Sequence, residues 1–192
     1  MSKPFRKLTA KTRVLDQSNV DTDQIIPARF LTATTREGFG EHAFHDRRWN
    51  ADGTEKADSP LPSSGPGEAT ILVAGKNFGC GSSREHAAWA LSDYGFKAVI
   101  SSGLADIFRA NALKNGLLAI DAPEEVYERL LTQPDIPVTI DLDAKTIAVG
   151  NDAPVAFEIE PFARTCLLEG VDQLGYLLAR EDSIAAFEAE RT

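Results

Sequence analysis

The sequence predicts an α/β protein with parallel core strands, and three observations lead to that prediction. Short apolar runs at residues 69–75, 97–101 and 117–121 have the length of buried strands, and a helical pattern follows each of them. Glycine or proline marks the ends of these helices. Strands that alternate with helices pair in parallel, because each helix returns the chain across the sheet. The length of 192 residues, 43% of them hydrophobic, is enough for one domain with a sizeable core.

The chain ahead of this alternation is less regular. Residues 8–15 alternate in the manner of a strand, and polar residues then form a turn before the apolar pair at 25–26. Residues 34–68 are rich in Gly, Pro, Ser and Asp and predict a long loop. Loops longer than about 12–15 residues are uncommon in compact domains unless they are functional or mobile, so this loop is a candidate substrate lid or partner contact. A disordered insertion is an equal alternative for residues 50–68 alone.

The remaining elements complete one domain. Residues 137–160 indicate strands joined by turns, which add antiparallel pairs. Helical patterns cover residues 84–95, 104–116, 123–132, 162–170 and 181–190. Together these elements predict a mixed sheet with parallel core strands flanked by helices, in a single domain over residues 1–192.

The charge balance narrows the class of partner. Lys and Arg number 20 and Asp and Glu number 29, which gives a net charge of −9 and a pI near 4.8. Nucleic acid and anionic membrane surfaces are therefore unfavourable as main partners. No run approaches the roughly 20 apolar residues of a membrane helix, and the polar start lacks the apolar segment of a secretory signal. A cytoplasmic location is expected.

The cysteines and histidines predict no metal centre in this chain. Cys80 and Cys166 are the only cysteines, too few for a disulfide framework or for an iron–sulfur cluster, which takes about four cysteine ligands. His42 and His45 lie in the long loop and His86 lies in the first turn of a helix, so no metal-ligand spacing emerges. Any iron–sulfur cluster is expected on another chain.

The most informative segment is the glycine-rich turn between the strand at 69–75 and the next helix. It carries Gly79, Gly81, Ser82, Ser83 and Arg84 directly before the helix. Backbone N–H groups and the positive end of the helix dipole converge there, and arginine adds a forked donor that binds a carboxylate with two hydrogen bonds. The letters fit neither the Walker pattern nor the dinucleotide fingerprint, so the predicted ligand is a carboxylate.

Two interpretations of this turn stay open. Ser82 and Glu85 fit the capping-box pattern, in which both side chains only accept hydrogen bonds from backbone N–H groups. The local sequence pattern alone favours that role. A serine hydroxyl acts as a base only where its alkoxide is stabilised, and a helix N-terminus beside an arginine offers that environment. The cluster as a whole leans towards ligand binding.

A second cluster of candidates is the turn with Asp21 and Asp23. Aspartates at this spacing are commonly loop caps, and that interpretation is preferred for Asp21. For Asp23, the cap and a functional role are equally favoured. The functional role would be to orient a catalytic partner or an arginine through a buried carboxylate.

Several separated motifs together resemble one known family. The segments NVDTDQIIPARFL, NFGCGSSREHAAWALSDYGFKAVI and LADIFRANALKNGLL, with TREGFGEHAF and CLLEGVDQLGYLLAREDSIAAFE, occur in the expected order over nearly the whole chain. They are similar to the small subunits of 3-isopropylmalate dehydratase, in the aconitase superfamily. The resemblance implies a swivelling β/β/α domain of the aconitase type that docks against a large subunit carrying a four-iron four-sulfur cluster. That placement agrees with the two cysteines of this chain.

The resemblance also implies an activity. The family's hydro-lyases interconvert 2-isopropylmalate and 3-isopropylmalate through isopropylmaleate in leucine biosynthesis, and iron on the partner acts as a Lewis acid on the departing hydroxyl. By motif, Ser82 corresponds to the base that removes the carbon-bound proton, Arg84 to the arginine that holds a substrate carboxylate, and Asp23 to a supporting residue. Further substrate-binding positions are expected at Gly81, Ser83, Thr32, Ala33 and, as a second carboxylate contact, Arg36.

Other functions stay open. The loop after the DTDQIIP segment reads Phe30-Leu31-Thr32-Ala33-Thr34 and has no arginine for a third carboxylate, which suits an isopropyl group and argues against homoaconitate. A small subunit for homoaconitate, citraconate or maleate is one alternative, and a non-catalytic carboxylate-binding module is another. RNA binding is disfavoured by the net charge of −9.

Overall fold

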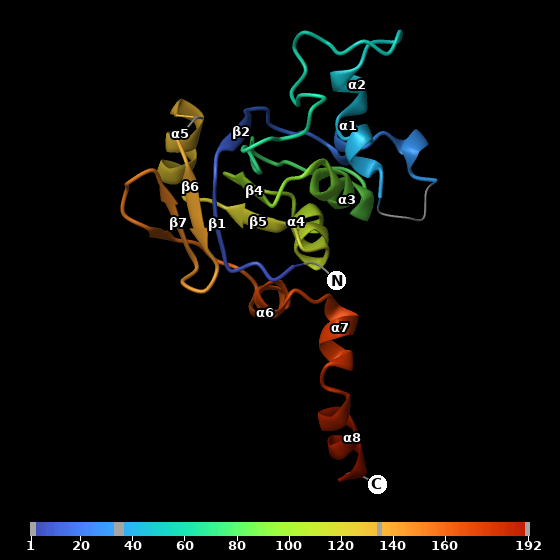
Figure 1. Ribbon diagram of the computed structural model, residues 1–192, viewed down its shortest axis with the longest axis vertical. Coiled ribbons are helices and arrows are strands. Elements are labelled where there is room, and N and C mark those ends of the chain that lie inside the picture. Colours follow the sequence, from blue (N-terminus) through green and yellow to red (C-terminus); the bar gives the residue numbers. More distant parts are fainter. Residues whose placement is uncertain (1–2, 33–36, 134–135, 191–192) are drawn as a thin grey trace.

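The computed structural model describes residues 3–32, 37–133 and 136–190, and within them the strands form two four-stranded sheets (Figure 1). One sheet is entirely parallel, in the order β2 (Thr12–Leu15), β3 (Ile71–Ala74), β4 (Ala98–Ser101) and β5 (Leu118–Asp121). The other is antiparallel, in the order β1 (Lys7–Ala10), β6 (Val138–Asp141), β7 (Thr146–Val149) and β8 (Val155–Ala156). The α/β class and the parallel core are confirmed, but the antiparallel strands make a sheet of their own.

The stretch expected as one strand, residues 8–15, is divided between the two sheets. β1 pairs with β6, whereas β2 pairs with β3, and Lys11 lies between them. The side chains of β1 alternate between exposed and half-buried, while Thr12 and Leu15 of β2 are buried. The apolar alternation continues through both strands, so the sequence pattern does not indicate that the chain passes from one sheet to the other.

Three of the predicted helices follow the parallel strands. α3 (Glu85–Tyr94) and α4 (Asp106–Lys114) pack on each other and lie to the right of the sheets in Figure 1. α5 (Glu124–Thr132) contacts β2, β3 and β7, and so joins the two sheets. In Figure 1, α3 and α4 lie on one side of the parallel sheet, and the antiparallel sheet and α5 lie on the other. All residues of β3 and β4 are buried between these layers, which explains why these strands are continuous apolar runs.

The C-terminal part contains two predicted helices and one that was not predicted. α6 (Pro161–Glu169) and α8 (Glu181–Ala189) were expected, and α7 (Gln173–Leu178) lies between them. α7 and α8 extend from α6 away from both sheets (Figure 1). In the described part of the chain, no helix is long and apolar enough to cross a membrane.

The helical elements of residues 37–68 are two short turns, η2 (Phe39–His42), which packs against α3, and α2 (His45–Arg48), which packs against α1 (Thr22–Ile25). The amide of Gly40 donates to Asp93 Oδ2 at 2.8 Å. Leu61 is fully buried, and the hydroxyl of Tyr94 donates to the carbonyl of Pro62 at 2.7 Å. These contacts tie both halves of the segment to the end of α3, which differs from a disordered insertion at 50–68.

Gly79 provides a stability test of the turn. It has a φ of 77°, and a Cβ added there would lie 2.2 Å from Cγ of Phe108. We expect Gly79→Ala to lower the free energy of unfolding by about 2 kcal/mol more than Gly53→Ala, because overpacking adds to the cost of a left-handed residue. Gly53 is the matched control, since its φ is 82° and nothing lies within 4 Å of its Cβ position. Urea unfolding of both variants measures the difference, and equal losses would contradict the steric argument.

Candidate functional site

The candidate site lies where the loops after β2, β3 and β4 meet at the carboxyl edge of the parallel sheet. The amide of Asn19 donates to the carbonyl of Lys76 at 2.9 Å, and the amide of Asn77 donates to the carbonyl of Gly103 at 2.6 Å. The side-chain amide of Asn77 also donates to Asn19 Oδ1 at 2.8 Å. Open parallel sheets bind their ligands at this edge, and here three loops are joined to build it.

The glycine-rich turn is held by the loop after β2. The amide of Gly79 donates to the carbonyl of Val20 at 2.7 Å, and the amide of Thr22 donates to the carbonyl of Cys80 at 2.9 Å. The Thr22 hydroxyl donates to the carbonyl of Ser82 at 3.0 Å, and Thr22 is 1% exposed. Thr22 therefore forms hydrogen bonds with the turn on both sides of Gly81.

The capping-box interpretation of Ser82 is wrong. α3 begins at Glu85, its N-cap residue is Arg84, and no side chain caps it. Ser82 lies two residues before the N-cap position, and the Glu85 carboxylate forms an ion pair with Lys114 at 2.6 Å. The pattern S-x-x-E requires the serine to be the N-cap residue. Here the backbone is still extended at Arg84, so the helix starts two residues too late for Ser82 to cap it. Ser82 and the neighbouring Ser83 are exposed at the edge of the site.

Asp23 forms an ion pair with Arg84 across 61 residues of sequence. The Arg84 side chain is only 17% exposed, and the Asp23 side chain is 53% exposed. The aspartate thus holds an arginine, as its functional interpretation expected, but its carboxylate is half exposed rather than buried. Asp21 is the N-cap of α1 (Thr22–Ile25) and accepts from the amide of Gln24 at 2.7 Å, which confirms its interpretation as a cap.

This arrangement suits a small anion. A guanidinium carries five N–H donors, and the pair with Asp23 engages one of its nitrogens, Nη1. The first amides of α3 and the positive end of its dipole lie directly after Arg84. A carboxylate bound beside Ser82 would meet a permanently charged donor and backbone N–H groups together.

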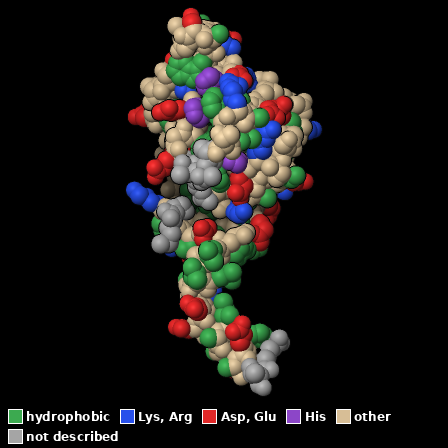
Figure 2. All heavy atoms as spheres, turned by 90° about the vertical axis from the view of Figure 1, so that its right-hand side faces the viewer, with side chains coloured by type: hydrophobic (Ala, Val, Ile, Leu, Met, Phe, Trp, Pro, Cys, Tyr) green, Lys and Arg blue, Asp and Glu red, His purple; other side chains and the backbone are tan. Residues whose placement is uncertain are grey.

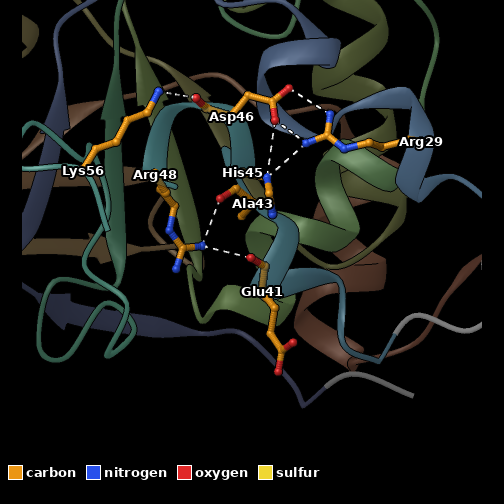
Figure 3. Close-up of polar contacts among 7 residues, drawn as sticks. All are labelled: Arg29, Glu41, Ala43, His45, Asp46, Arg48 and Lys56. Atoms are coloured by element: carbon orange, nitrogen blue, oxygen red, sulfur yellow. Dashed lines mark hydrogen bonds and ion pairs between the residues drawn. The ribbon is translucent and has the colours of Figure 1, made fainter. Parts of the chain in front are cut away.

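The segment expected to select the substrate side chain is only partly described. Thr32 is exposed just after a 3-10 turn, η1 (Ala28–Phe30). Ala33 and Arg36 lie outside the described residues. The chain ahead of them is well anchored, because the Phe30 ring stacks on the His42 ring with centroids 3.9 Å apart and Arg29 forms an ion pair with Asp46 (Figure 3).

The Arg29–Asp46 pair predicts a pH effect on stability. The hydrogen bond from Arg29 lowers the pKa of the Asp46 carboxyl, and a weaker contribution comes from His45. A carboxyl whose pKa is lowered by folding stabilises the fold above its ordinary pKa of 3.8, and this stabilisation disappears as the pH falls through the lowered value. We expect Asp46→Asn to lower the melting temperature slightly at pH 7, and this difference from the parent protein to shrink as the pH falls below 3.8 and through the lowered pKa. A constant difference at all pH values would contradict this assignment.

A hollow of about 960 Å³ lies elsewhere on the surface. It is formed by residues 38–65 and the end of α3, and none of the predicted site residues lines it. Its most buried charged residue is Arg48, which is 2% exposed and donates to the carbonyls of Gly40, Glu41 and Ala43. Figure 3 shows the bonds to Glu41 and Ala43. Because Arg48 binds three backbone carbonyls of residues 40–43, its burial is explained by a structural role in this segment.

The two cysteines are too few to be the ligands of an iron–sulfur cluster, which takes about four. Cys80 is half-buried and Cys166 is buried, and burial raises the pKa of the Cys166 thiol. Among the described residues, no group of three or more His, Cys, Asp or Glu side chains could hold a metal ion. The residues present therefore do not fit such a cluster.

Thr22 is the candidate that the sequence did not indicate. Its contacts are with residues 58 and 60 positions away in the chain, through loops that only the folded sheet brings together. A threonine between two aspartates has no local pattern that distinguishes this role from that of a buried helix residue.

Comparisons with known proteins agree with this architecture. Residues 2–125 match the aconitase C-terminal domain family, and this range contains the whole parallel sheet and the glycine-rich turn. The chain is 50% identical to the 3-isopropylmalate dehydratase small subunit of Chloroflexus aurantiacus strain J-10-fl, over 97% of this chain and 94% of that protein. It is also 50% identical to the small subunit of Anaeromyxobacter dehalogenans strain 2CP-C, over 98% of each chain.

A solved structure gives the same result. The fold is similar to the crystal structure of 3-isopropylmalate dehydratase from Methanocaldococcus jannaschii, with a TM-score of 0.68 and 27% identity over 97% of this chain and 99% of that chain. The chain belongs to the family of 3-isopropylmalate dehydratase small subunits within the aconitase superfamily. The family inferred from the sequence motifs is confirmed.

Proposed function

We propose that this chain forms half of the active site of a hydro-lyase that interconverts 2-isopropylmalate and 3-isopropylmalate through isopropylmaleate, in the cytoplasm and for leucine biosynthesis. The curated relatives carry the name of this enzyme's small subunit. The observation that carries the proposal is the turn itself, in which an exposed Ser82 without a capping role lies two residues before an Arg84 held by Asp23.

The residues of the glycine-rich turn have separate roles in binding and in proton transfer. Arg84 holds a substrate carboxylate, and Gly81 and Ser83 contribute to binding beside it. Ser82, as an alkoxide stabilised by Arg84 and the α3 N-terminus, takes the proton from the carbon next to that carboxylate. The electron pair of the broken C–H bond forms the double bond of isopropylmaleate as the hydroxyl departs from the adjacent carbon. The reverse steps add water at the other carbon.

The partner completes the site. The large subunit is the expected partner, and the four-iron four-sulfur cluster is expected there because this chain's described residues do not provide its ligands. We propose that Thr32 and Ala33 lie beside the isopropyl group and that Arg36 is the second carboxylate contact. The absence of an arginine at residues 30–34 supports isopropylmalate over homoaconitate.

Anaerobic turnover of 3-isopropylmalate tests the proposed function. The absorbance of isopropylmaleate is followed with this chain alone, with the cluster-loaded large subunit alone, and with both mixed. We expect activity only in the mixture. No activity in a mixture with a verified intact cluster would overturn the substrate assignment, and parallel assays with homoaconitate, citraconate and maleate would then identify the substrate.

The contact between Thr22 and Ser82 gives a further prediction. Thr22→Val keeps the shape of the side chain but removes the hydroxyl that binds the Ser82 carbonyl. We expect kcat to fall about 3–10-fold, which corresponds to the roughly 0.5–1.5 kcal/mol of one hydrogen bond, with KM much less affected. Thr22→Ser restores the hydroxyl and should recover most of kcat. Unchanged turnover in Thr22→Val would show that the turn does not depend on this contact.

A further inference from the structure

Exposed apolar side chains gather on the C-terminal helices. Six large hydrophobic residues are exposed in the described part of the chain, and five of them lie on α7 and α8. These five are Leu174, Leu177, Leu178, Ile184 and Phe187, between 40% and 63% exposed. Figure 2 shows hydrophobic and acidic side chains along the segment that extends from the body. We call residues 171–190 the C-terminal arm.

The apolar side chains of each helix share one face. An α-helix turns by 100° per residue, so Leu174, Leu177 and Leu178 lie within one 100° sector of α7. Ile184 and Phe187 are neighbours on α8 by the same geometry. On α7 the opposite face carries Tyr176, which packs on the body, so the leucines face away from it.

The root of the arm is fixed to the body. The Tyr176 ring meets the Phe162 ring of α6 edge to face, with centroids 4.9 Å apart. Arg180 stacks on Tyr176 with its guanidinium carbon 3.5 Å from the ring centroid, and it forms an ion pair with Glu169 at 3.1 Å. Asp172 caps α7 by accepting from the amide of Gly175 at 2.7 Å. These contacts give the arm a defined direction, with its apolar face presented to solvent.

The charge of the arm indicates which kind of partner can bind its apolar face. It carries five carboxylates and one arginine, a net charge of −4. A second copy of this chain that packed arm against arm would bring two faces of this charge together, which is unfavourable. A different protein with an apolar groove edged by Lys and Arg side chains is complementary both in polarity and in charge.

The arm lies outside the family match but within the alignments with the curated small subunits. The aconitase C-terminal domain match ends at residue 125, whereas the curated small subunits align with 97–98% of the chain. We propose that the C-terminal arm is a docking element that the large subunit binds in an apolar groove edged by basic side chains. The choice of partner rests on the proposed function.

Matched double variants on α8 test this proposal. Ile184→Glu with Phe187→Glu places two charges on the apolar face. Ala185→Glu with Ala189→Glu adds the same charges to the same helix on the other face, at positions that are also exposed. Both variants are measured as full-length chains with the cluster-loaded large subunit, by sedimentation without substrate. Circular dichroism of each chain alone checks that the fold is retained.

We expect the apolar-face variant to weaken binding at least tenfold and the control at most two- to threefold, with parent affinity falling as salt is raised. Parent-like affinity in both variants, or an equal loss in both, would overturn the proposal. A dimer of the free chain that dissociates in the apolar-face variant, with large-subunit binding unchanged, would assign the arm to a second copy instead. A complex that assembles through the arm but does not turn over isopropylmalate would remove the proposed function and leave the docking assignment standing.

Discussion

In the complex with the large subunit, we expect Ser82→Ala to lose about 10²–10⁴-fold in kcat, the range that a positioned acid or base contributes. Ser82 is exposed, it lies two residues before the Arg84 that pairs with Asp23, and its side chain does not cap α3. Removing it leaves the backbone of the turn and the Arg84 guanidinium in place, so KM should change little. Anaerobic turnover of 3-isopropylmalate at saturating substrate measures the loss.

The control is Ser64→Ala, which removes an exposed serine hydroxyl from the loop between α2 and β3. It should keep the parent kcat, and both variants should form the complex as the parent chain does. Turnover of Ser82→Ala within threefold of the parent would show that this chain contributes no base. It would instead favour a module that only binds a carboxylate.

The parts of the fold that local sequence patterns determine were predicted well. β3, β4 and β5 are buried apolar runs bounded by turns, and the helices that follow them end at glycine or begin after proline. The hydrophobic period and the end residues of each element lie within that element, so one sequence is enough to read them. The parallel pairing then follows from the alternation of strands and helices.

The parts that depend on distant contacts could not be predicted in the same way. The pattern S-x-x-E fits a capping box, but the extended backbone of Arg84 places the helix start after Ser82. The Thr22–Ser82 and Asp23–Arg84 contacts join residues about 60 positions apart, through loops that meet only at the sheet edge. This is why local pattern left Asp23 undecided and did not indicate Thr22.

The arm shows a different limit. α7 lies within a motif that supported the family resemblance, but its six residues include Gly175 and carry an apolar face that no part of the described body covers. A short helix gains most of its stability from packing, so propensity alone predicts it weakly. The contacts of Tyr176 with Phe162 and of the following Arg180 with Glu169 become visible only in three dimensions.

Arg84→Ala is expected to raise KM for 3-isopropylmalate about 10–100-fold, because a hydrogen bond to a charged group contributes about 1.5–3 kcal/mol and 1.4 kcal/mol is a factor of ten. Asp23→Asn keeps the shape of the side chain but removes the charge that holds Arg84, so a smaller rise of about 3–10-fold is expected. Lys97→Ala is the control, since it removes an exposed cation just before β4, at the opposite edge of the sheet, and should leave KM unchanged.

The double variant Arg84→Ala with Asp23→Asn distinguishes a direct role for Asp23 from a role exerted through Arg84. If Asp23 acts only by positioning the guanidinium, the double variant has the same KM as Arg84→Ala alone, because the interaction that Asp23 supports is already absent. KM effects that multiply in the double variant would instead show that Asp23 contributes to the site independently of its ion pair. A parent-like KM in Arg84→Ala would exclude Arg84 as the carboxylate anchor and leave the backbone donors of the turn, at the start of α3, as the anion-binding groups of this chain.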